Sequence, residues 1–219
     1  MRVLVTGGAG FIGSHLCDAL IGRGQETWCA DNFHLGRRRN IEHLDSEPLF
    51  HFRELDVADR APLQALFAEA AFDAVFHLAA NSDIRAGLDD PELDLRLNFE
   101  TTFQVLECMK ASGVKRLFFA STSAVFGETT DILDEKYGPL MPISPYGASK
   151  LSAEAFVSLY ALTHGVSSVV LRFPNVVGER ATHGAVFDFM NKLDKTPDRL
   201  EVLGDGSQSK PYLYVGDLI

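Results

Sequence analysis

Short apolar runs rich in β-branched residues alternate with longer segments whose apolar positions repeat at helical spacing. In the segment 11–24, for example, Ile12, Leu16, Ala19 and Leu20 fall on one side of a helix that ends among glycines. Parallel strands need long, right-handed crossovers, so this order predicts a doubly wound parallel α/β sheet with its site at the carboxyl ends of the strands. The predicted strands cover residues 2–6, 26–31, 49–55, 72–80, 114–121 and 166–173, and the predicted helices cover 11–24, 61–70, 91–113 and 144–165.

The pattern loosens after residue 174. Pro174, Gly178 and Gly184 interrupt it, and the last stretch, "LGDGSQSKPYLYVGDLI", is rich in turn-forming residues. We therefore expect residues 1–174 to form one α/β domain. Residues 175–219 should begin a smaller second lobe that this chain does not finish.

Charge and composition narrow the possible partners. The 219 residues carry a net charge of −10, which argues against nucleic acid or an anionic membrane surface. No apolar run has the length of a membrane span, and the N-terminus lacks a signal-peptide core. The wide spacing of Cys17, Cys29 and Cys108 fits reduced thiols in a cytoplasmic protein. No metal is predicted, because the histidines lack ligand spacing and His15 and His77 are interpreted as packing residues.

A glycine-rich turn, "TGGAGFIG" at 6–13, follows the first predicted strand and opens the first predicted helix. Gly7, Gly10 and Gly13 would let the backbone approach a pyrophosphate at the helix N-terminus, where free N–H groups and the helix dipole favour an anion. A tight strand–helix turn would also use glycine. The strand before, the helix after and an acid at the end of the next strand favour a dinucleotide site in a Rossmann-type domain.

That acid is Asp31, which can accept hydrogen bonds from the adenosine ribose hydroxyls. A carboxylate there repels a 2′-phosphate, so NAD is favoured over NADP. The alternative is a turn or cap residue. The basic cluster "GRRR" at 36–39 could bind a phosphate, but we interpret it as a solvated loop. Asp56 ends the third strand, where it could bond the adenine amino group or cap the next helix.

The motif "YGASK" places Tyr146 and Lys150 four residues apart on a predicted helix, and therefore on one face of it. A nearby ammonium favours phenolate, so we expect the pKa of Tyr146 to be lowered. Such a tyrosine could take a proton from a sugar hydroxyl. An amphipathic tyrosine with a snorkelling lysine is the alternative, and the glycine turn upstream makes the catalytic interpretation the better one.

Three hydroxyls follow an apolar run in "FFASTSAVFG" at 118–127. Ser121, Thr122 and Ser123 could bond backbone amides at the strand end. One of them could instead contact a substrate, and both interpretations can hold. Ser121 is the more structural candidate.

Together these residues resemble the extended short-chain dehydrogenase/reductase family, in its branch of NAD-dependent nucleotide-sugar epimerases and dehydratases. The resemblance extends over the whole chain and implies that residues 1–174 bind NAD. It also implies that 175–219 is a partial substrate-binding lobe, truncated at its C-terminus. The blocks that carry it are "VTGGAGFIGSHL", "ADN", "LDVAD", "FHLAA", "STSAVFG", "SPYGASK", "LRFPNVVG" and "GDGSQSKPYLYVGDL".

The resemblance implies a role for each matching residue. On the substrate side, Thr122, Ser123 and Tyr146 would contact the sugar, and Asn175 and Lys210 its diphosphate. Lys210 stands where arginine is common, and Pro211 and Gly216 stand where acids are usual. Catalysis would fall to Thr122, Tyr146 and Lys150. The cofactor residues implied are Gly7, Gly10, Phe11, Ile12, Gly13, Asp31, Asn32, Asp56, Val57, Leu78, Ala79, Ala80, Asn98, Tyr146, Lys150 and Phe173.

Ser123 and Ala124 distinguish between the reactions of this branch. Its 4,6-dehydratases have an acid pair there, and neither residue here can act as a general acid or base at neutral pH. This favours a nucleotide-sugar 4-epimerase, and a UDP-sugar is the preferred substrate. The alternatives are a 4-keto reductase or dehydrogenase, a less favoured 4,6-dehydratase, and a nucleotide-sensing protein without turnover. The resemblance also implies a homodimer formed through the helices 91–113 and 144–165.

Overall fold

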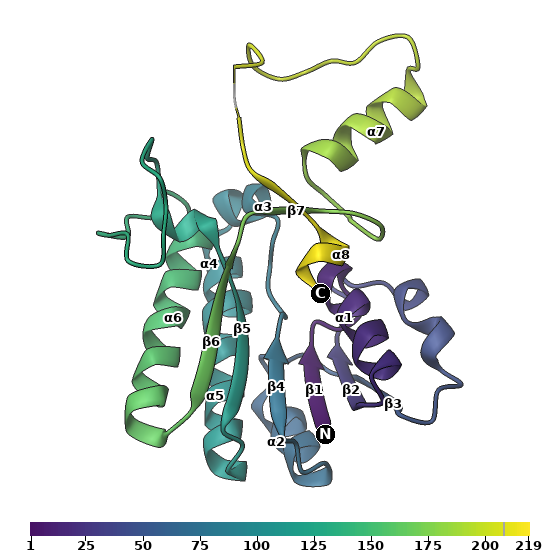
Figure 1. Ribbon diagram of the computed structural model, residues 1–219, viewed down its shortest axis with the longest axis vertical. Helices are drawn as coiled ribbons and strands as arrows, with labels where there is room; N and C mark the ends of the chain where they lie inside the picture. The colour runs from purple at the N-terminus through teal and green to yellow at the C-terminus, as the bar shows by residue number, and fades with distance from the viewer. Residues whose placement is uncertain (208) are drawn as a thin grey trace.

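The protein is described by a computed structural model over residues 1–207 and 209–219, and its centre is a six-stranded parallel sheet (Figure 1). The strand order is β3-β2-β1-β4-β5-β6, which confirms the predicted doubly wound α/β class. The order reverses between β1 and β4, and this reversal opens a crevice at the carboxyl ends of the strands. The strands are β1 Arg2–Thr6, β2 Glu26–Asp31, β3 Phe50–Glu54, β4 Ala74–His77, β5 Arg116–Thr122 and β6 Ser167–Phe173.

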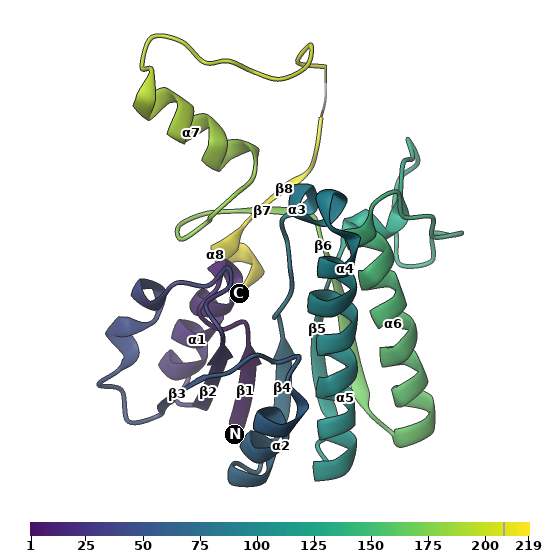
Figure 2. The same ribbon diagram turned by 180° about the vertical axis from the view of Figure 1, so that it is seen from behind.

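Helices cover both faces of the sheet, and each face has its own apolar core (Figures 1 and 2). Leu4 belongs to the core beneath α2, α5 and α6, whereas its neighbours Val3 and Val5 belong to the core beneath α1. This division follows from the alternation of side chains along a strand. The helices are α1 Phe11–Gly22, α2 Arg60–Glu69, α3 Ile84–Asp89, α4 Pro91–Asp94, α5 Thr101–Ser112, α6 Pro145–His164, α7 Ala185–Lys195 and α8 Val215–Leu218.

The segment predicted as one helix over 91–113 is helical but not regular. A π-helical stretch, Leu95–Glu100, joins α4 to α5. The Thr102 hydroxyl donates to the Asn98 carbonyl at 2.7 Å, and the Asn98 side chain is fully buried. Such wide turns are common near functional sites. Here the turn brings Asn98 under the start of α6.

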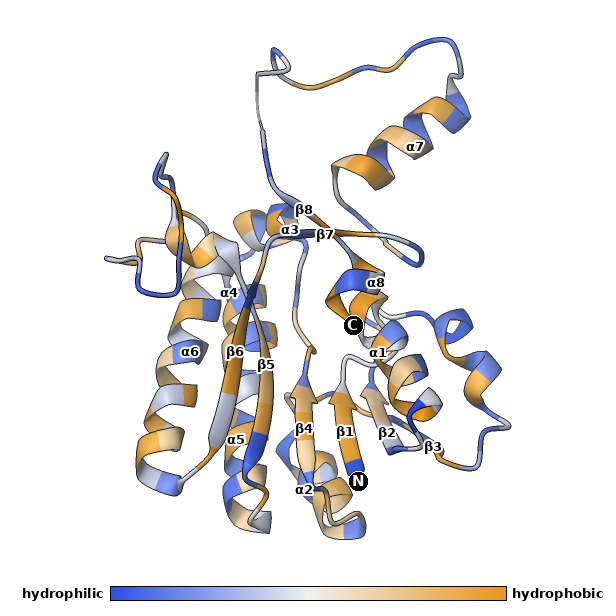
Figure 3. Cartoon of the chain, in the orientation of Figure 1, coloured by the Kyte–Doolittle hydropathy of each residue, from blue (hydrophilic) through white to orange (hydrophobic). Residues whose placement is uncertain are grey.

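The residues after 174 form a separate small layer. β7 (Asn175–Val177) pairs in parallel with β8 (Tyr212–Tyr214), and α7 stands apart from the sheet (Figures 1 and 2). No side chain of α7 is buried. Figure 3 shows apolar and polar positions side by side along this helix, and Val186, Met190 and Leu193 are exposed. No helix in the described part of the chain is long and apolar enough to cross a bilayer.

An ion pair fixes the carboxyl ends of β5 and β6 beside the start of the second lobe. Glu154 on α6 accepts a hydrogen bond from the Ser121 hydroxyl and pairs with Arg172, whose Nη2 lies 2.8 Å from Oε2. The Arg172 guanidinium also lies 5.1 Å from the centre of the Phe126 ring. Ser121 therefore has the structural role expected of it, and its neighbour Thr122 is held at the end of β5.

Replacing Glu154 with alanine should destabilise the protein by about 3 kcal/mol, because Arg172 and Ser121 would lose their buried acceptor. Urea unfolding measures the change. Glu69→Ala is the matched control, since Glu69 pairs with Arg53 on the surface, and it should cost less than about 1 kcal/mol. Equal losses in the two variants would contradict the assignment.

Candidate active site

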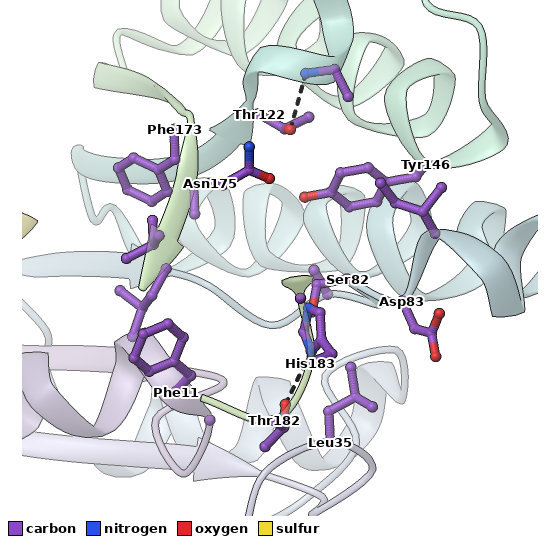
Figure 4. Close-up of a pocket in the computed structure, with 18 of the residues that line it drawn as sticks. Phe11, Leu35, Ser82, Asp83, Thr122, Tyr146, Phe173, Asn175, Thr182 and His183 are labelled. Atoms are coloured by element: carbon purple, nitrogen blue, oxygen red, sulfur yellow. Dashed lines mark hydrogen bonds between the residues drawn. The ribbon is translucent and has the colours of Figure 1, made fainter. Parts of the chain in front are cut away.

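One cavity of about 1480 Å³ lies at the carboxyl ends of the strands. It runs from the glycine turn to the second lobe, and Figure 4 shows part of its lining. Except for Asn98, every site residue named from the sequence lines this cavity. These lining residues are Gly7, Gly10, Phe11, Ile12, Gly13, Asp31, Asn32, Asp56, Val57, Leu78, Ala79, Ala80, Thr122, Ser123, Tyr146, Lys150, Phe173, Asn175 and Lys210.

The glycine turn brings three pieces of backbone into contact. Gly7 has φ +71°, and a Cβ atom there would lie 2.7 Å from the backbone nitrogen of Ala79. A Cβ atom at Gly13 would strike the carbonyl of Gly7. Gly10 begins α1 without a side-chain cap, so the first N–H groups of the helix are left for a ligand. This cradle fits a pyrophosphate.

Asp31 closes the adenosine end of the cavity. Its Oδ2 accepts from the backbone nitrogen of Ala9 at 2.9 Å, and its Oδ1 accepts from that of Phe33 at 2.7 Å. Burial raises the pKa of this carboxyl, and the two backbone donors oppose the rise. Each oxygen keeps a further lone pair for a ribose hydroxyl. Gly36 packs against the carboxylate, since a Cβ atom there would lie 2.6 Å from Oδ1.

Asp56 lines the cavity, whereas the basic cluster at 36–39 has no arginine in the lining. The Asp56 carboxylate accepts from the backbone nitrogen of Ala58 at 2.9 Å and pairs with Arg96 at 3.2 Å. The N-cap of α2 is Asp59, so the helix-cap alternative for Asp56 is wrong. The three arginines at 37–39 are exposed and none of them lines the cavity. Arg38 pairs with Asp45 in its own loop, which agrees with the interpretation as a solvated loop.

The start of α6 delivers Tyr146 to the cavity. The Ser144 hydroxyl caps the helix by accepting from the backbone nitrogen of Gly147 at 3.1 Å. Gly147 packs so closely on the 3₁₀ turn Ser123–Phe126 that a Cβ atom would lie 2.7 Å from the Ala124 carbonyl. Figure 4 shows the Tyr146 hydroxyl pointing into the space near Thr122 and Asn175. The Thr122 hydroxyl itself accepts from the Ala124 nitrogen at 3.1 Å.

Lys150 is buried one helical turn below Tyr146. Its Nζ donates to the Ala120 carbonyl at 2.9 Å and lies 4.9 Å from the centre of the Phe119 ring. Burial lowers the pKa of Lys150 to about 8, and the carboxylates of Asp94 and Glu154 partly offset this effect. The neutral form is therefore within reach near physiological pH.

The pKa of Tyr146 differs from the sequence-based expectation. We expected Lys150 to lower it, but burial of the phenol raises it, and hydrogen bonding with Thr122 opposes only part of the rise. The Asp94 carboxylate adds to the increase. The expectation is therefore wrong for this structure, because the desolvation of the phenol dominates.

Asn98 supports the site from beneath instead of lining it. Its Nδ2 donates to Asp94 Oδ1 at 2.9 Å and to Ser149 Oγ at 3.1 Å, and Ser149 Oγ in turn donates to the Tyr146 carbonyl at 2.9 Å. Asp94 also accepts from Asn81 Nδ2 at 2.8 Å. Sequence reasoning missed this network. The four-residue spacing of Asp94 and Asn98 on one helix face was the available signal.

His77 is a fully buried residue of β4 with a packing role. Its Nδ1 lies 2.7 Å from the Thr6 hydroxyl and its Nε2 lies 3.0 Å from that of Thr102. Burial lowers the pKa of His77 to about 3, so the ring is neutral. Among the residues that the structure describes, no three histidine, cysteine or acidic side chains gather in a metal-binding arrangement.

The end of β6 and the residues after it supply the other wall of the cavity. Phe173 ends β6, and Asn175 begins β7, where its Nδ2 donates to the Pro211 carbonyl at 3.3 Å. This bond joins the two strands near Lys210. Ser82, Asp83, Thr182 and His183 also line the cavity (Figure 4), and sequence reasoning had not named them. They lie on loops with no periodic pattern or motif to identify them.

A glycine turn after β1, an acid at the end of β2 and a tyrosine–lysine pair on a helix beside β5 define a dinucleotide-dependent enzyme scaffold of the short-chain dehydrogenase/reductase type. The sequence profile of the NAD dependent epimerase/dehydratase family matches residues 3–219. The chain belongs to this family.

Similar proteins catalyse more than one reaction. A UDP-glucose 4-epimerase of Mycolicibacterium smegmatis is 31% identical over 100% of this chain and 71% of its own length. The structure of a Thermus thermophilus UDP-glucose 4-epimerase in complex with NAD is 34% identical, with a TM-score of 0.88, and the match covers 100% of this chain and 72% of that one. The dTDP-glucose 4,6-dehydratase DesIV of Streptomyces venezuelae is 29% identical, with a TM-score of 0.92, and the match covers 100% and 69%.

The cavity fits NAD, the cofactor of this family. The glycine cradle suits a pyrophosphate, and the Asp31 carboxylate disfavours a 2′-phosphate. Leu78, Ala79 and Ala80 directly follow β4 and have no polar side chains. They line the groove between the glycine cradle and Asp31.

Burial of Lys150 should make the unfolding free energy depend on pH. Its folded-state pKa of about 8 lies below the ordinary 10.5, so the unfolded state binds its proton more tightly. Below pH 8 this difference destabilises the folded protein, and as pH rises from 8 to 10.5 the penalty disappears. Relative to Lys150→Met, wild type should therefore gain on the order of 3 kcal/mol in unfolding free energy as pH rises from 7 to above 10.5.

The measurement is the difference in unfolding free energy between wild type and Lys150→Met across this pH range. Taking the difference cancels the cysteines and tyrosines, which also titrate at alkaline pH. The unfolding free energy of wild type should rise relative to that of the variant as pH rises. A difference that stays constant with pH would contradict the burial-driven shift.

Proposed function

We propose that this protein is an NAD-dependent nucleotide-sugar 4-epimerase. The observation that carries the proposal is the end of β5, where Thr122 and Tyr146 meet in the cavity and the next two residues, Ser123 and Ala124, are not acids. A 4-epimerase needs a group that moves the proton of the C4 hydroxyl. It does not need the acids that remove water from a sugar.

Each catalytic side chain has a distinct part in the proposed reaction. Tyr146 Oη takes the C4 hydroxyl proton and later returns it, and Thr122 Oγ1 orients that hydroxyl. Lys150, held on the Ala120 carbonyl, stabilises the phenolate when its ammonium is charged. When bound, NAD supplies reversible hydride transfer at C4. Because the sugar leaves at the oxidation state at which it entered, the same proton path serves both halves of the reaction. Between them the 4-keto sugar would rotate, so that hydride would return to its opposite face and C4 would be inverted.

Three other acids, Asp83, Glu128 and Asp188, line the cavity. None of them stands at the two positions after Thr122. Asp83 is the N-cap of α3 and accepts from the backbone nitrogens of Arg85 and Ala86. Glu128 and Asp188 are exposed to solvent. The cavity therefore supports proton transfer at one hydroxyl better than elimination of water.

The substrate proposed is a UDP-sugar, with Ser123 against the sugar and Asn175 and Lys210 at its diphosphate. Lys210 supplies charge without the bidentate fork of arginine. The similarity to UDP-glucose 4-epimerases supports this choice. Residues 175–219 would then form part of the sugar-binding side, and residues 1–174 would hold the cofactor.

We also propose a homodimer formed through α5 and α6. Phe99 and Phe103 pack against Phe156 at ring-centre distances of 5.0 and 5.9 Å, which holds the two helices together. Leu159 and Leu162 of α6 remain exposed. A second copy could cover this apolar edge.

Tyr146→Phe should lower the rate of 4-epimerisation by about 10² to 10⁴ because the proton carrier is lost, while NAD binding persists. The assay supplies a panel of UDP-, GDP- and dTDP-sugars and identifies the products by chromatography. Tyr137→Phe is the matched control, since Tyr137 packs on Phe126 away from the cavity lining and its loss should leave the rate unchanged. Full activity in Tyr146→Phe would refute the assignment.

The products also separate the candidate reactions. An epimerase forms the C4 epimer with no lasting change in NADH absorbance and no loss of water. Net production or consumption of NADH would instead identify a dehydrogenase or 4-keto reductase. Tight NAD binding with no turnover of any sugar nucleotide would identify a sensing protein.

A further inference from the structure

A single carboxylate on α1 pairs with two loops that are far apart in the sequence. Asp18 Oδ1 lies 2.7 Å from His43 Nε2, and Asp18 Oδ2 lies 2.8 Å from Arg180 Nη1. His43 belongs to the 3₁₀ turn Glu42–Leu44 after β2. Arg180 lies in the segment between β7 and α7. An ionised carboxylate only accepts hydrogen bonds, so the His43 Nε2 atom carries the proton.

Both loops line the half of the cavity that begins at the glycine turn. His34, Leu35 and Gly36 come from the loop after β2, and Thr182 and His183 come from the segment after β7. Leu35, Thr182 and His183 are among the lining side chains labelled in Figure 4. A dinucleotide seated on the glycine turn would therefore lie under two separate loops, which we call the first lid (residues 32–45) and the second lid (residues 178–184).

The two lids differ in how firmly the rest of the protein holds them. The first lid is bound to the glycine turn, because the backbone nitrogen of Arg37 and the side chain of Asn40 both donate to the Ala9 carbonyl. The second lid meets α1 through the Asp18–Arg180 pair and through His15 Nε2, which lies 3.0 Å from the Glu179 carbonyl.

Arg180 has φ +65°, in the left-handed region that costs energy for a side chain other than glycine. Gly178 and Gly184 also have positive φ, so the second lid begins and ends at easily rotated positions. A strained residue persists where its surroundings hold it. The Asp18 carboxylate holds this one through its guanidinium.

We propose that Asp18 fastens both lids over the cofactor and thereby sets how long NAD stays bound. Asp18 does not line the cavity, so it acts as a positioning residue through His43 and Arg180. The proposal depends on the family cofactor and on the lid geometry. It does not depend on the sugar or on the reaction proposed above.

The first test measures cofactor release. Bound NADH is displaced by excess NAD⁺ and followed by its fluorescence, without any sugar substrate. Asp18→Ala should release NADH about three- to tenfold faster, as expected when the partly exposed ion pair with Arg180 and the hydrogen bond with His43 are lost. Asp45→Ala is the matched control, because Asp45 pairs with Arg38 inside the first lid without reaching α1. Its release rate should equal that of wild type.

Salt provides an independent check on the same rates. Release from wild type should accelerate between about 50 mM and about 500 mM salt, because the Asp18 pairs are screened. Release from Asp18→Ala should change much less. Equal release rates for wild type and Asp18→Ala at low salt, or release from Asp45→Ala as fast as release from Asp18→Ala, would overturn the proposal.

A second test reports on the lid without cofactor. Trypsin cleaves after arginine, and Arg180 should become a faster cleavage site when Asp18 no longer holds it. Asp18→Ala should therefore be cut after Arg180 sooner than wild type or Asp45→Ala. Unchanged cleavage at this bond would contradict the fastening role.

A double-mutant cycle separates fastening from direct contact of Arg180 with the nucleotide. Arg180→Gln should accelerate NADH release, and combining it with Asp18→Ala should add only the smaller effect of the His43 contact. Fully additive effects would show that the two residues act separately, which would overturn the proposal. Circular dichroism and thermal unfolding of each variant confirm that the compared proteins are folded.

Discussion

The close approach of backbone at Gly7 is the constraint on which the cavity depends. The Gly7 nitrogen donates to the Ala30 carbonyl at 2.8 Å, and a side chain at Gly7 would collide with Ala79. The ends of β1, β2 and β4 therefore meet within one turn of chain, directly beneath the N-terminus of α1. A single larger residue there would separate the anion-binding amides from Asp31 and from the groove.

The second constraint is electrostatic and lies at the other end of the cavity. A fully buried Lys150 is costly, and the protein limits that cost with the Ala120 carbonyl, the Phe119 ring and the carboxylates of Asp94 and Glu154. Glu154 also joins β5 to β6 through Arg172. Glu154 thus acts on both Lys150 and the strand end that carries Thr122. The geometry of the proposed proton path and the charge of Lys150 are therefore coupled.

The sequence predicted the fold well where local patterns decide it. The strands of the sheet and the helix that carries Tyr146 follow from periodicity and from signals such as Ser144–Pro145. The sequence predicted the structure poorly where contacts between residues distant in the sequence decide it. The direction of the pKa shift at Tyr146 depends on burial, and the pairing of Asp18 with Arg180 joins residues far apart in the sequence. The π-helical turn at Asn98 depends on packing against α6, which no local pattern encodes.

Overall similarity cannot choose between the reactions of this family. The dehydratase structure superimposes with a TM-score of 0.92 and the epimerase with 0.88, so the backbone is shared by both chemistries. The family resemblance implies that the two reactions differ in side chains at the end of β5, where the dehydratases have an acid pair. There Thr122 remains beside Tyr146, while Ser123 and Ala124 offer no proton donor for the departure of water. The choice of reaction therefore rests on these two positions, because the same cavity and cofactor cradle would serve either enzyme.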